Sequence, residues 1–456
     1  MLRGQSEMFR RRCKKLLPKF NSYLCNEQSP LFIDKKEAYT TRGTVLKVTK
    51  LLIQAFLPNC HIGTICQILP TNVLVEVIAI DTNLITALPF SDSANVAFGQ
   101  DIIIHSTSLK IKVNENMLGN IFDGFGNPVN LDLNTDFYKA EFDELDLHAK
   151  PPIFVDRDII NTAVPSGVRC IDALLTIGIG QRIGIFAGSG VGKSSLLGMI
   201  SNGIKGDILI LALIGERGRE VNEFLAGLPT ETKNKTILIV STSDSSALER
   251  MKAAYTATTV AEWYRDKGNH VVLLMDSLTR YARALRDVTL AAGESLVRGG
   301  YTSTVFAELP ILLERTGPGR KGAITAIYTV LTEDDSINDA LGDEIRSLLD
   351  GHIFLSRKLA ASNFFPAIDI NHSTSRVMKN IVSPEHYNSS GVFKSWWSKY
   401  AEVELLIRIG EYQRNIDPEM DIIVDKHNEM SLFLKQNTAP HASYESTIKQ
   451  LISIVS

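Results

Sequence analysis

The sequence has little of what marks a membrane, secreted or metal-binding protein. No apolar run approaches the roughly 20 residues that cross a bilayer, and the N-terminus lacks the apolar stretch of a signal peptide. Among 456 residues there are only five cysteines, an odd and scattered set that is more typical of reduced thiols than of disulfides or a zinc site. We therefore expect a cytoplasmic protein. The cysteines are Cys13, Cys25, Cys60, Cys66 and Cys170.

A strong excess of one charge is also missing, because the formal net charge is only -3. A protein built to hold nucleic acid usually carries a basic domain, so we expect no nucleic-acid partner. Hydrophobic residues make up 44% of the chain and charged residues 22%, which is typical of a globular protein with a large core. The sequence shows neither an internal repeat nor a low-complexity segment.

A cluster of basic residues marks a predicted tail, residues 1–37. Arginines and lysines between Arg3 and Lys19 are interleaved with apolar side chains such as Phe9 and Leu16. One interpretation is a flexible, solvated tail. The other is a basic amphipathic helix that contacts a membrane surface or an acidic partner.

Period-two alternation predicts a small β domain, a sandwich or a barrel, over residues 38–113. Val73, Val75 and Val77 alternate with their neighbours, and so do the apolar residues of 109–113. Turn-forming residues separate such runs. Residues 114–160, with Gly, Asn and Pro clusters and an acidic stretch, are predicted to connect the barrel to the next domain.

Nearly continuous apolar runs then predict an α/β domain over residues 161–377. Runs of this kind are typical of a parallel sheet that is covered on both faces. Residues 378–456 are predicted to be helical, since Trp396, Tyr400, Val403 and Ile407 recur at helical spacing on one face. The runs predicted as strands are 182–188, 207–215, 235–244, 270–276 and 323–331.

The segment "AGSGVGKSS", residues 187–195, fits a phosphate-binding loop between a strand and a helix. Its glycines let backbone N–H groups turn inward toward phosphate oxygens, and the following helix N-terminus also favours an anion. Lys193 would lie near the β- and γ-phosphates, and Ser194 would offer a hydroxyl to Mg²⁺. The predicted phosphate-binding residues are Gly188, Ser189, Gly190, Val191, Gly192, Lys193, Ser194 and Ser195.

Two carboxylates follow other predicted strands. Asp276 ends "VVLLMD", where a second Mg²⁺-holding group is expected. Glu216, in "ALIGERGREVNEF", can orient and polarise a water for attack on a γ-phosphate. The alternative for Glu216 is a carboxylate at a helix start that pairs with Arg217 or Arg219, and the spacing alone leaves both possibilities open.

Several motifs together resemble the export ATPases of type III secretion systems, which are related to the catalytic subunits of rotary ATP synthases. They include "GIFAGSGVGKSSLLGMI", "LIGERGREVNEF", "LLMDSLTRYARALRD" and "FFPAIDINHSTSRVM", and the resemblance covers about residues 38–456. "DEIRSLLDGHIFLSRKLA" and "VELLIRIGEYQ" look like the virulence injectisome branch rather than the flagellar one. The resemblance implies an α/β, RecA-like P-loop NTPase core with an N-terminal β-barrel and a C-terminal helical domain.

The resemblance also implies roles for individual residues toward ATP and Mg²⁺. Lys193 and Ser194 would hold phosphate and magnesium, and Glu216 would be the catalytic carboxylate. Arg217 would support the γ-phosphate, and Asp276 would hold the Mg²⁺ shell through water.

Two further residues are assigned by the resemblance, near the end of the α/β domain. Phe365 would pack against the adenine ring. Arg376 would be an arginine finger that reaches the nucleotide of the neighbouring subunit, a role suited to its planar, permanently charged side chain.

The implied function is ATP hydrolysis by a homohexameric ring that energises protein secretion, releasing chaperones from exported proteins and unfolding them. The implied partners are a stator or regulator protein, a central stalk protein, secretion chaperones with their effectors, and a membrane export gate at the inner face of the bacterial inner membrane. Alternatives are a flagellar export ATPase, a Rho-like nucleic-acid translocase and a non-catalytic nucleotide-binding ring subunit. The last would lack the glutamate found at Glu216.

Overall fold

The computed structural model describes residues 41–91, 93, 95–129, 136–332, 339–438 and 443–456. The chain divides into two compact units, one ending at Thr107 and the other beginning at Ser108. The predicted basic tail of residues 1–37 lies outside the described residues.

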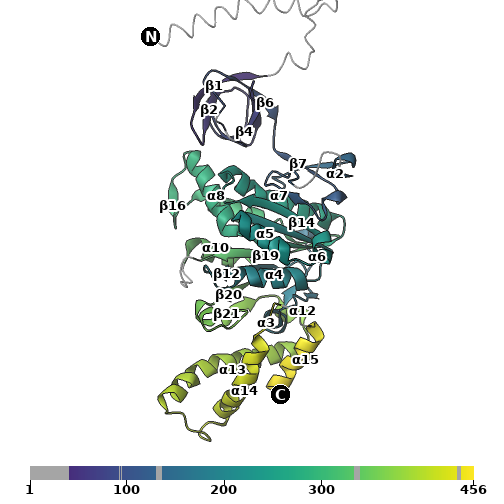
Figure 1. Cartoon of the computed structure of the whole chain (residues 1–456), viewed down its shortest axis with the longest axis vertical. Coiled ribbons are helices and arrows are strands. Elements are labelled where there is room, and N and C mark those ends of the chain that lie inside the picture. Colours follow the sequence, from purple (N-terminus) through teal and green to yellow (C-terminus); the bar gives the residue numbers. More distant parts are fainter. Residues whose placement is uncertain (1–40, 92, 94, 130–135, 333–338, 439–442) are drawn as a thin grey trace, which may run out of the picture. The chain divides into compact units, whose positions relative to one another are not determined.

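The first unit contains a closed barrel of antiparallel strands, as predicted (Figure 1). Pairing of β1 with β6 closes it, and its interior holds alternate side chains such as Val75 and Val77 of β4, both fully buried. Period-two patterning therefore reports the buried face here. In barrel order the strands are β1 (Arg42–Val48), β2 (Ile53–Phe56), β5 (Leu84–Pro89), β4 (Val73–Asp81), β3 (Ile65–Leu69) and β6 (Asp101–Ser106).

Two short strands lie elsewhere than their sequence patterns indicated. β7 (Lys110–Val113), inside the predicted barrel range, pairs with β9 (Asp143–Asp146) in the second unit. β8 (Ile121–Phe122), inside the predicted connector, pairs with β14 (Thr236–Thr242) and forms an edge of the large sheet. Alternation shows that one face of a strand is buried but does not identify the partner strand. The predicted domain boundaries thus stay predictions.

A nine-stranded sheet forms the centre of the second unit. Every residue of its strand β13 is buried, which requires helices on both faces of the sheet. All five apolar runs predicted as strands lie in this sheet, and Figure 1 labels three of them, β12, β14 and β19. In sheet order the strands are β21 (Ile368–Ser375), β20 (Gly351–Leu355), β12 (Arg182–Ala187), β19 (Ala323–Leu331), β15 (His270–Asp276), β13 (Ile208–Glu216), β14 (Thr236–Thr242) and β8, with β18 (Gly317–Pro318) beside β19.

The direction of the strands decides where a ligand site can form. The strands from β20 to β8 in this order run parallel, whereas β21 runs antiparallel to β20. The carboxyl ends of the parallel strands meet at one edge, where ligands bind in open α/β sheets. β21 instead begins at that edge and runs back to the opposite one.

Helices connect and cover these strands, and α7 packs along β13, β14 and β15. The helices are α2 (Asp136–Lys139), α3 (Arg169–Leu174), α4 (Lys193–Gly203), α5 (Gly218–Gly227), α6 (Thr230–Asn234), α7 (Ala247–Asp266), α8 (Leu278–Ala291), α9 (Ser303–Leu313), α10 (Ala340–Leu348), α11 (Arg357–Ala361) and α12 (Met378–Ile381). Short 3₁₀ turns and strand pairs complete the unit: η2 (Glu115–Met117), η3 (Phe154–Asp156), β10 (Ala163–Val164) with β11 (Ile177–Gly178), and β16 (Leu296–Arg298) with β17 (Tyr301–Thr302).

The C-terminal region is helical, as predicted, and its helices pack on one another and on α3 (Figure 1). The stripe predicted on α13 is only partly buried, since Val403 is buried but Ile407 is 39% exposed. Within the described ranges, none of the helices combines the length and apolar character needed to cross a membrane. The helices are α13 (Pro384–Ile409), α14 (Pro418–Leu434) and α15 (Tyr444–Val455).

A buried carboxylate fixes the turn that precedes α3. The side chain of Asp172 is fully buried and accepts hydrogen bonds from the backbone N–H groups of Ser166 (2.7 Å) and Gly167 (3.1 Å). The hydroxyl of Ser166 donates a third bond of 2.7 Å. Burial raises the pKa of Asp172 to about 6, against the opposing effect of these hydrogen bonds.

We expect this carboxyl group to make folding stability depend on pH. Between its ordinary pKa near 4 and about 6, the native state holds a proton that the unfolded state has lost. The free energy of unfolding therefore falls as pH rises through this window. Asp172→Asn removes this titrating group, so the variant should not show the same loss of stability. The free energy of unfolding of the variant minus that of the native chain should therefore be about 1 kcal/mol larger at pH 7 than at pH 5. Urea unfolding of both chains at the two pH values measures this change, and a constant difference would contradict it.

Candidate active site

The predicted phosphate-binding loop lies between β12 and α4. β12 ends at Ala187, and α4 begins at Lys193. Gly190 (φ 78°) and Gly192 (φ 92°) adopt left-handed backbone conformations, which side chains with a Cβ atom rarely tolerate. The loop therefore turns directly into a helix N-terminus, an arrangement that favours phosphate groups.

Lys193 brings together the two predicted carboxylates. Its Nζ lies 2.5 Å from Asp276 Oδ1 and 3.4 Å from Glu216 Oε1. These carboxylates end β15 and β13, which are neighbouring parallel strands. The loop lysine, the strand-end aspartate and the candidate base thus meet at the carboxyl edge of the sheet.

Glu216 is held in a surrounding that disfavours its charge. Its side chain is 9% exposed, and burial together with the charge of Asp276 raises its pKa, although the cations Lys193 and Arg280 oppose the rise. A carboxylate with a raised pKa accepts a proton more readily, which suits a group that activates water.

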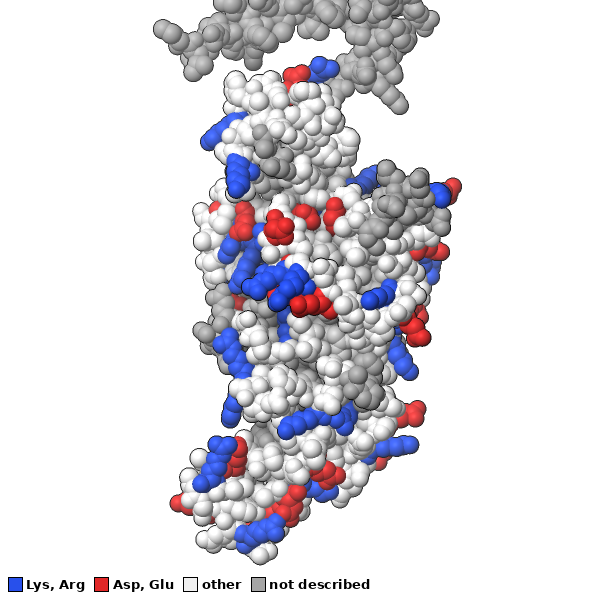
Figure 2. Space-filling view, viewed as in Figure 1, with Lys and Arg blue, Asp and Glu red and all other residues white. Residues whose placement is uncertain are grey.

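The alternative pairing of Glu216 with Arg217 or Arg219 is not what the structure shows. Arg217 lies 3.7 Å from Glu220, and Arg219 lies 3.6 Å from Glu223, with both arginine side chains about three-quarters exposed. Figure 2 shows basic and acidic side chains clustered together over the middle of the α/β region. Arg217 and Arg219 still line the cavity in front of the phosphate-binding loop, so they face the site without pairing with Glu216.

Arg280 is a site residue that the sequence reasoning missed. Its Nε lies 3.3 Å from Glu216 Oε1, and the close approach depends on Gly215, where a Cβ atom would lie only 2.7 Å from Arg280 Cδ. The signal was available, because Arg280 follows Asp276 by about one helical turn. That spacing does not indicate its partner Glu216, which ends a different strand, β13.

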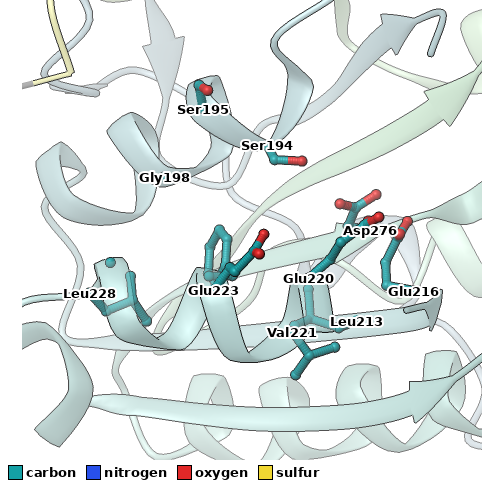
Figure 3. Close-up of a pocket in the computed structure, with 12 residues that line it drawn as sticks. Ser194, Ser195, Gly198, Leu213, Glu216, Glu220, Val221, Glu223, Leu228 and Asp276 are labelled. Atoms are coloured by element: carbon teal, nitrogen blue, oxygen red, sulfur yellow. The ribbon is translucent and has the colours of Figure 1, made fainter. Parts of the chain in front are cut away.

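Two cavities open beside the loop. One of about 670 Å³ is lined by loop residues together with arginines that include Arg280 and Arg357, a size that suits a nucleotide. The other lies between α4 and α5 and is lined by Ser194, Glu216 and Asp276 (Figure 3). Ser194 directs its hydroxyl toward the side of this cavity on which both carboxylates lie.

These oxygen ligands fit a magnesium ion that arrives with a nucleotide. Hydroxyl and carboxylate oxygens are the ligands that Mg²⁺ prefers, and the ion is usually held by one or two carboxylates plus substrate phosphates and water. In the part of the chain that the structure describes, no group of three or more His, Cys, Asp or Glu side chains is placed to hold a metal by itself. Ser194 and Asp276 would therefore share the ion with phosphate oxygens.

Phe365 lies beside the phosphate-binding loop of its own chain. A Cβ atom built on Gly192 would be 3.2 Å from Phe365 Cε1, and the phenylalanine is 39% exposed. An aromatic face of this kind, next to the phosphate-binding loop, is available to pack on a planar base.

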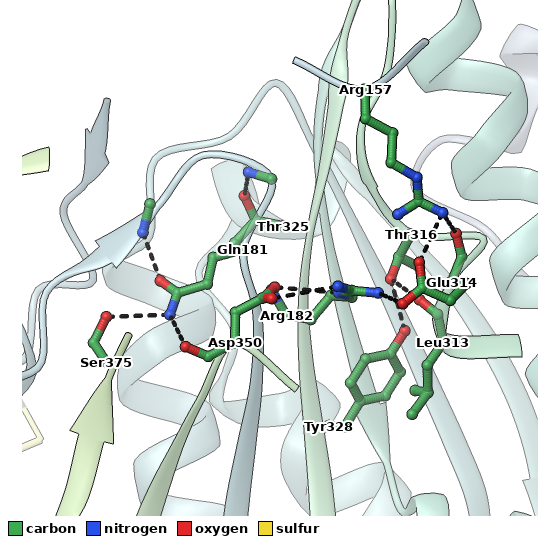
Figure 4. Close-up of polar contacts among 12 residues, drawn as sticks. Arg157, Gln181, Arg182, Leu313, Glu314, Thr316, Thr325, Tyr328, Asp350 and Ser375 are labelled. Carbon is green, nitrogen blue, oxygen red and sulfur yellow. Dashed lines mark hydrogen bonds and ion pairs between the residues drawn. The ribbon is translucent and has the colours of Figure 1, made fainter. Parts of the chain in front are cut away.

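Arg376 lies at the opposite edge of the sheet. It follows the last residue of β21, whose eight residues span about 25 Å at roughly 3.3 Å each. Its backbone N–H donates to the carbonyl of Asp350 (2.9 Å), and the side chain of Asp350 accepts from Arg182 at the start of β12 (Figure 4). The exposed Arg376 is thus anchored far from the loop of its own chain.

Comparison with known proteins agrees with the sequence motifs. The model of the ATP synthase alpha/beta family, nucleotide-binding domain, matches residues 167–375. That of the T3SS EscN ATPase C-terminal domain matches residues 382–453.

Known relatives match over nearly the whole chain. The SPI-2 type 3 secretion system ATPase of Salmonella typhimurium is 44% identical over 92% of this chain and 96% of its own length. The flagellum-specific ATP synthase of Bacillus subtilis is 42% identical over 92% and 97%.

Two solved structures of the assembled ATPase EscN of enteropathogenic E. coli, one in complex with its central stalk EscO, are 52% and 51% identical. They match with TM-scores of 0.88 and 0.85, over 91% of this chain and 100% of each of theirs. The chain therefore belongs to the ATPases of type III secretion systems, a branch of the ATP synthase alpha/beta family.

Proposed function

We propose that this ATPase works as a homohexameric ring in which each ATP is bound by one subunit and its hydrolysis is completed by the next. The carrying observation is the placement of the site residues at two edges of one sheet. Lys193, Glu216, Asp276 and Phe365 lie at one edge, and Arg376 lies at the other. A head-to-tail ring would bring these edges together between copies.

Within one subunit, different residues bind the phosphates, the magnesium ion and the adenine ring. The loop from Gly188 to Ser195 holds the phosphates through backbone N–H groups and Lys193. Ser194 would ligate Mg²⁺ directly and Asp276 through water, and the ion, when bound, neutralises phosphate charge. Phe365 packs on the adenine ring.

Glu216 acts on the water that attacks the γ-phosphate. Its raised pKa makes it a stronger base than an ordinary glutamate, and Arg280 at 3.3 Å holds it in place. Arg217, which faces the larger cavity, supports the γ-phosphate. Arg376 of the neighbouring copy stabilises the charge that develops during transfer.

The ring would energise type III protein secretion by releasing chaperones from exported proteins and unfolding them. EscN is solved in an assembled form and with its central stalk, which supports a ring and a stalk partner for this chain as well. The further proposed partners are a stator or regulator protein, chaperones with effectors, and an export gate at the inner face of the membrane. Flagellar export is the second candidate, because a flagellar relative is 42% identical.

The proposal is tested by ATP turnover of Lys193→Ala. Removing the ammonium group should lower kcat by at least about 10²–10³-fold, because it stabilises transferred phosphate charge. Phosphate release at saturating ATP measures the loss, with thermal unfolding as a check on folding. Lys205→Ala, an exposed lysine just beyond α4, is the matched control, and substantial turnover by Lys193→Ala would exclude the loop as the phosphate site.

A further inference from the structure

Gln436 joins the C-terminal helices to the segment that carries Phe365. It follows the end of α14 and makes hydrogen bonds to two separate segments of the chain. Its backbone N–H donates to the carbonyl of Phe365 (3.0 Å). Its side chain donates from Nε2 to the carbonyl of Gly167 (2.8 Å) and accepts at Oε1 from the N–H of Arg169 (2.8 Å).

The side-chain hydrogen bonds suit an amide. The same side chain donates to the carbonyl of Gly167 and accepts from the N–H of Arg169. Only Asn and Gln carry both a carbonyl and an NH₂ group in one side chain. The adjoining Lys435 strengthens the connection, because its carbonyl accepts from the guanidinium of Arg169 and its Nζ lies 5.1 Å from the ring centre of Phe364.

The turn that Gln436 holds is itself fixed to the helix of the phosphate-binding loop. Ser166 and Gly167 are bound by the buried Asp172. A Cβ atom on Gly203, the last residue of α4, would lie only 2.4 Å from the carbonyl oxygen of Ser166. Lys193 begins this same helix, so Gln436 links the Phe365 segment to the element that binds phosphate.

We propose that Gln436 is a positioning residue that holds Phe365 at the distance from the phosphate-binding loop that an adenine base requires. This inference rests on the proposed function, in which the base packs on Phe365. Gln436 lines neither cavity beside the loop, and it acts through the backbone of Phe365. Its loss weakens binding of the base while the phosphate contacts and the transfer step remain.

The test compares kinetic constants of the full chain with those of Gln436→Ala. Base–aromatic stacking is worth about fivefold to a hundredfold in affinity, and loosening it should raise KM for ATP at least about fivefold. We expect kcat to stay within about twofold, and inhibition by inorganic tripolyphosphate, which carries no base, to be unchanged. Gln436→Glu, which loses the donor to Gly167, should behave like Gln436→Ala. Asn437→Ala, the exposed neighbour, should keep the native KM.

A double-mutant cycle with Phe365→Ala separates positioning from general destabilisation. If Gln436 acts through Phe365, adding Gln436→Ala to Phe365→Ala should leave KM where Phe365→Ala alone puts it. Multiplied effects, an equal loss of tripolyphosphate binding, or an unchanged KM in Gln436→Ala would overturn the inference. Absence of ATP turnover in the native chain would instead overturn the proposed function.

Discussion

Arg376→Ala is expected to lower kcat for ATP hydrolysis by about 10³–10⁵-fold, the range by which arginine fingers act in other phosphoryl-transfer enzymes. Nucleotide binding by the isolated chain should be unchanged, because Arg376 lies at the sheet edge opposite the loop of its own subunit. Steady-state turnover and fluorescent-nucleotide binding measure the two quantities. Lys379→Ala, which removes a nearby exposed cation on α12, serves as the control and should keep nearly native turnover.

Mixing two inactive chains tests whether the arginine acts across a subunit boundary. An Arg376→Ala chain keeps its loop, and a Lys193→Ala chain keeps its finger. In randomly mixed rings about a quarter of head-to-tail interfaces would join an intact loop to an intact finger, so activity should reappear on mixing. Well-mixed rings without any recovery would count against an arginine supplied by the neighbour.

Glu216→Gln is expected to reduce kcat by about 10²–10⁴-fold, the usual contribution of a general base, while ATP still binds. Glutamine has nearly the same shape but cannot take a proton from water. Because burial and Asp276 raise the pKa of Glu216, the native enzyme should lose activity on the acid side at a higher pH than an ordinary glutamate would cause. Measuring kcat as a function of pH gives the apparent pKa of this loss of activity on the acid side.

Glu223→Gln provides the matched control for this substitution. Glu223 lines the same small cavity, but its side chain is 62% exposed and lies beside Arg219. We expect near-native turnover from Glu223→Gln. If Glu216→Gln lost binding and turnover equally, Glu216 would have a structural role.

Local motifs predicted much of this site because its parts are contiguous with the strands that carry them. The loop at residues 187–195 follows β12, and Glu216 and Asp276 each end a strand. Parallel pairing then places these ends at one edge. Periodicity therefore indicated the α/β fold class, and the motifs at the strand ends supplied the candidate groups that the structure places beside Lys193.

Residues whose partners are distant in sequence could not be found in this way. Arg280 pairs with Glu216, 64 residues away, and Gln436 meets Gly167, 269 residues away. The local sequence around Arg280 or Gln436 does not indicate the residue that it contacts. β7 and β8 show the same limit, because the residue pattern of a short strand indicates which face is buried but not which strand it pairs with.

The anchoring of Arg376 beside the start of β12 would give the proposed ring a direction. β12 begins at Arg182, which Asp350 holds next to Arg376, and it ends at the phosphate-binding loop. A shift of this strand when phosphate leaves would therefore reach the catalytic group offered to one neighbour and not the other. The order in which subunits around the ring hydrolyse ATP would then depend on the direction of one strand, β12, within each subunit.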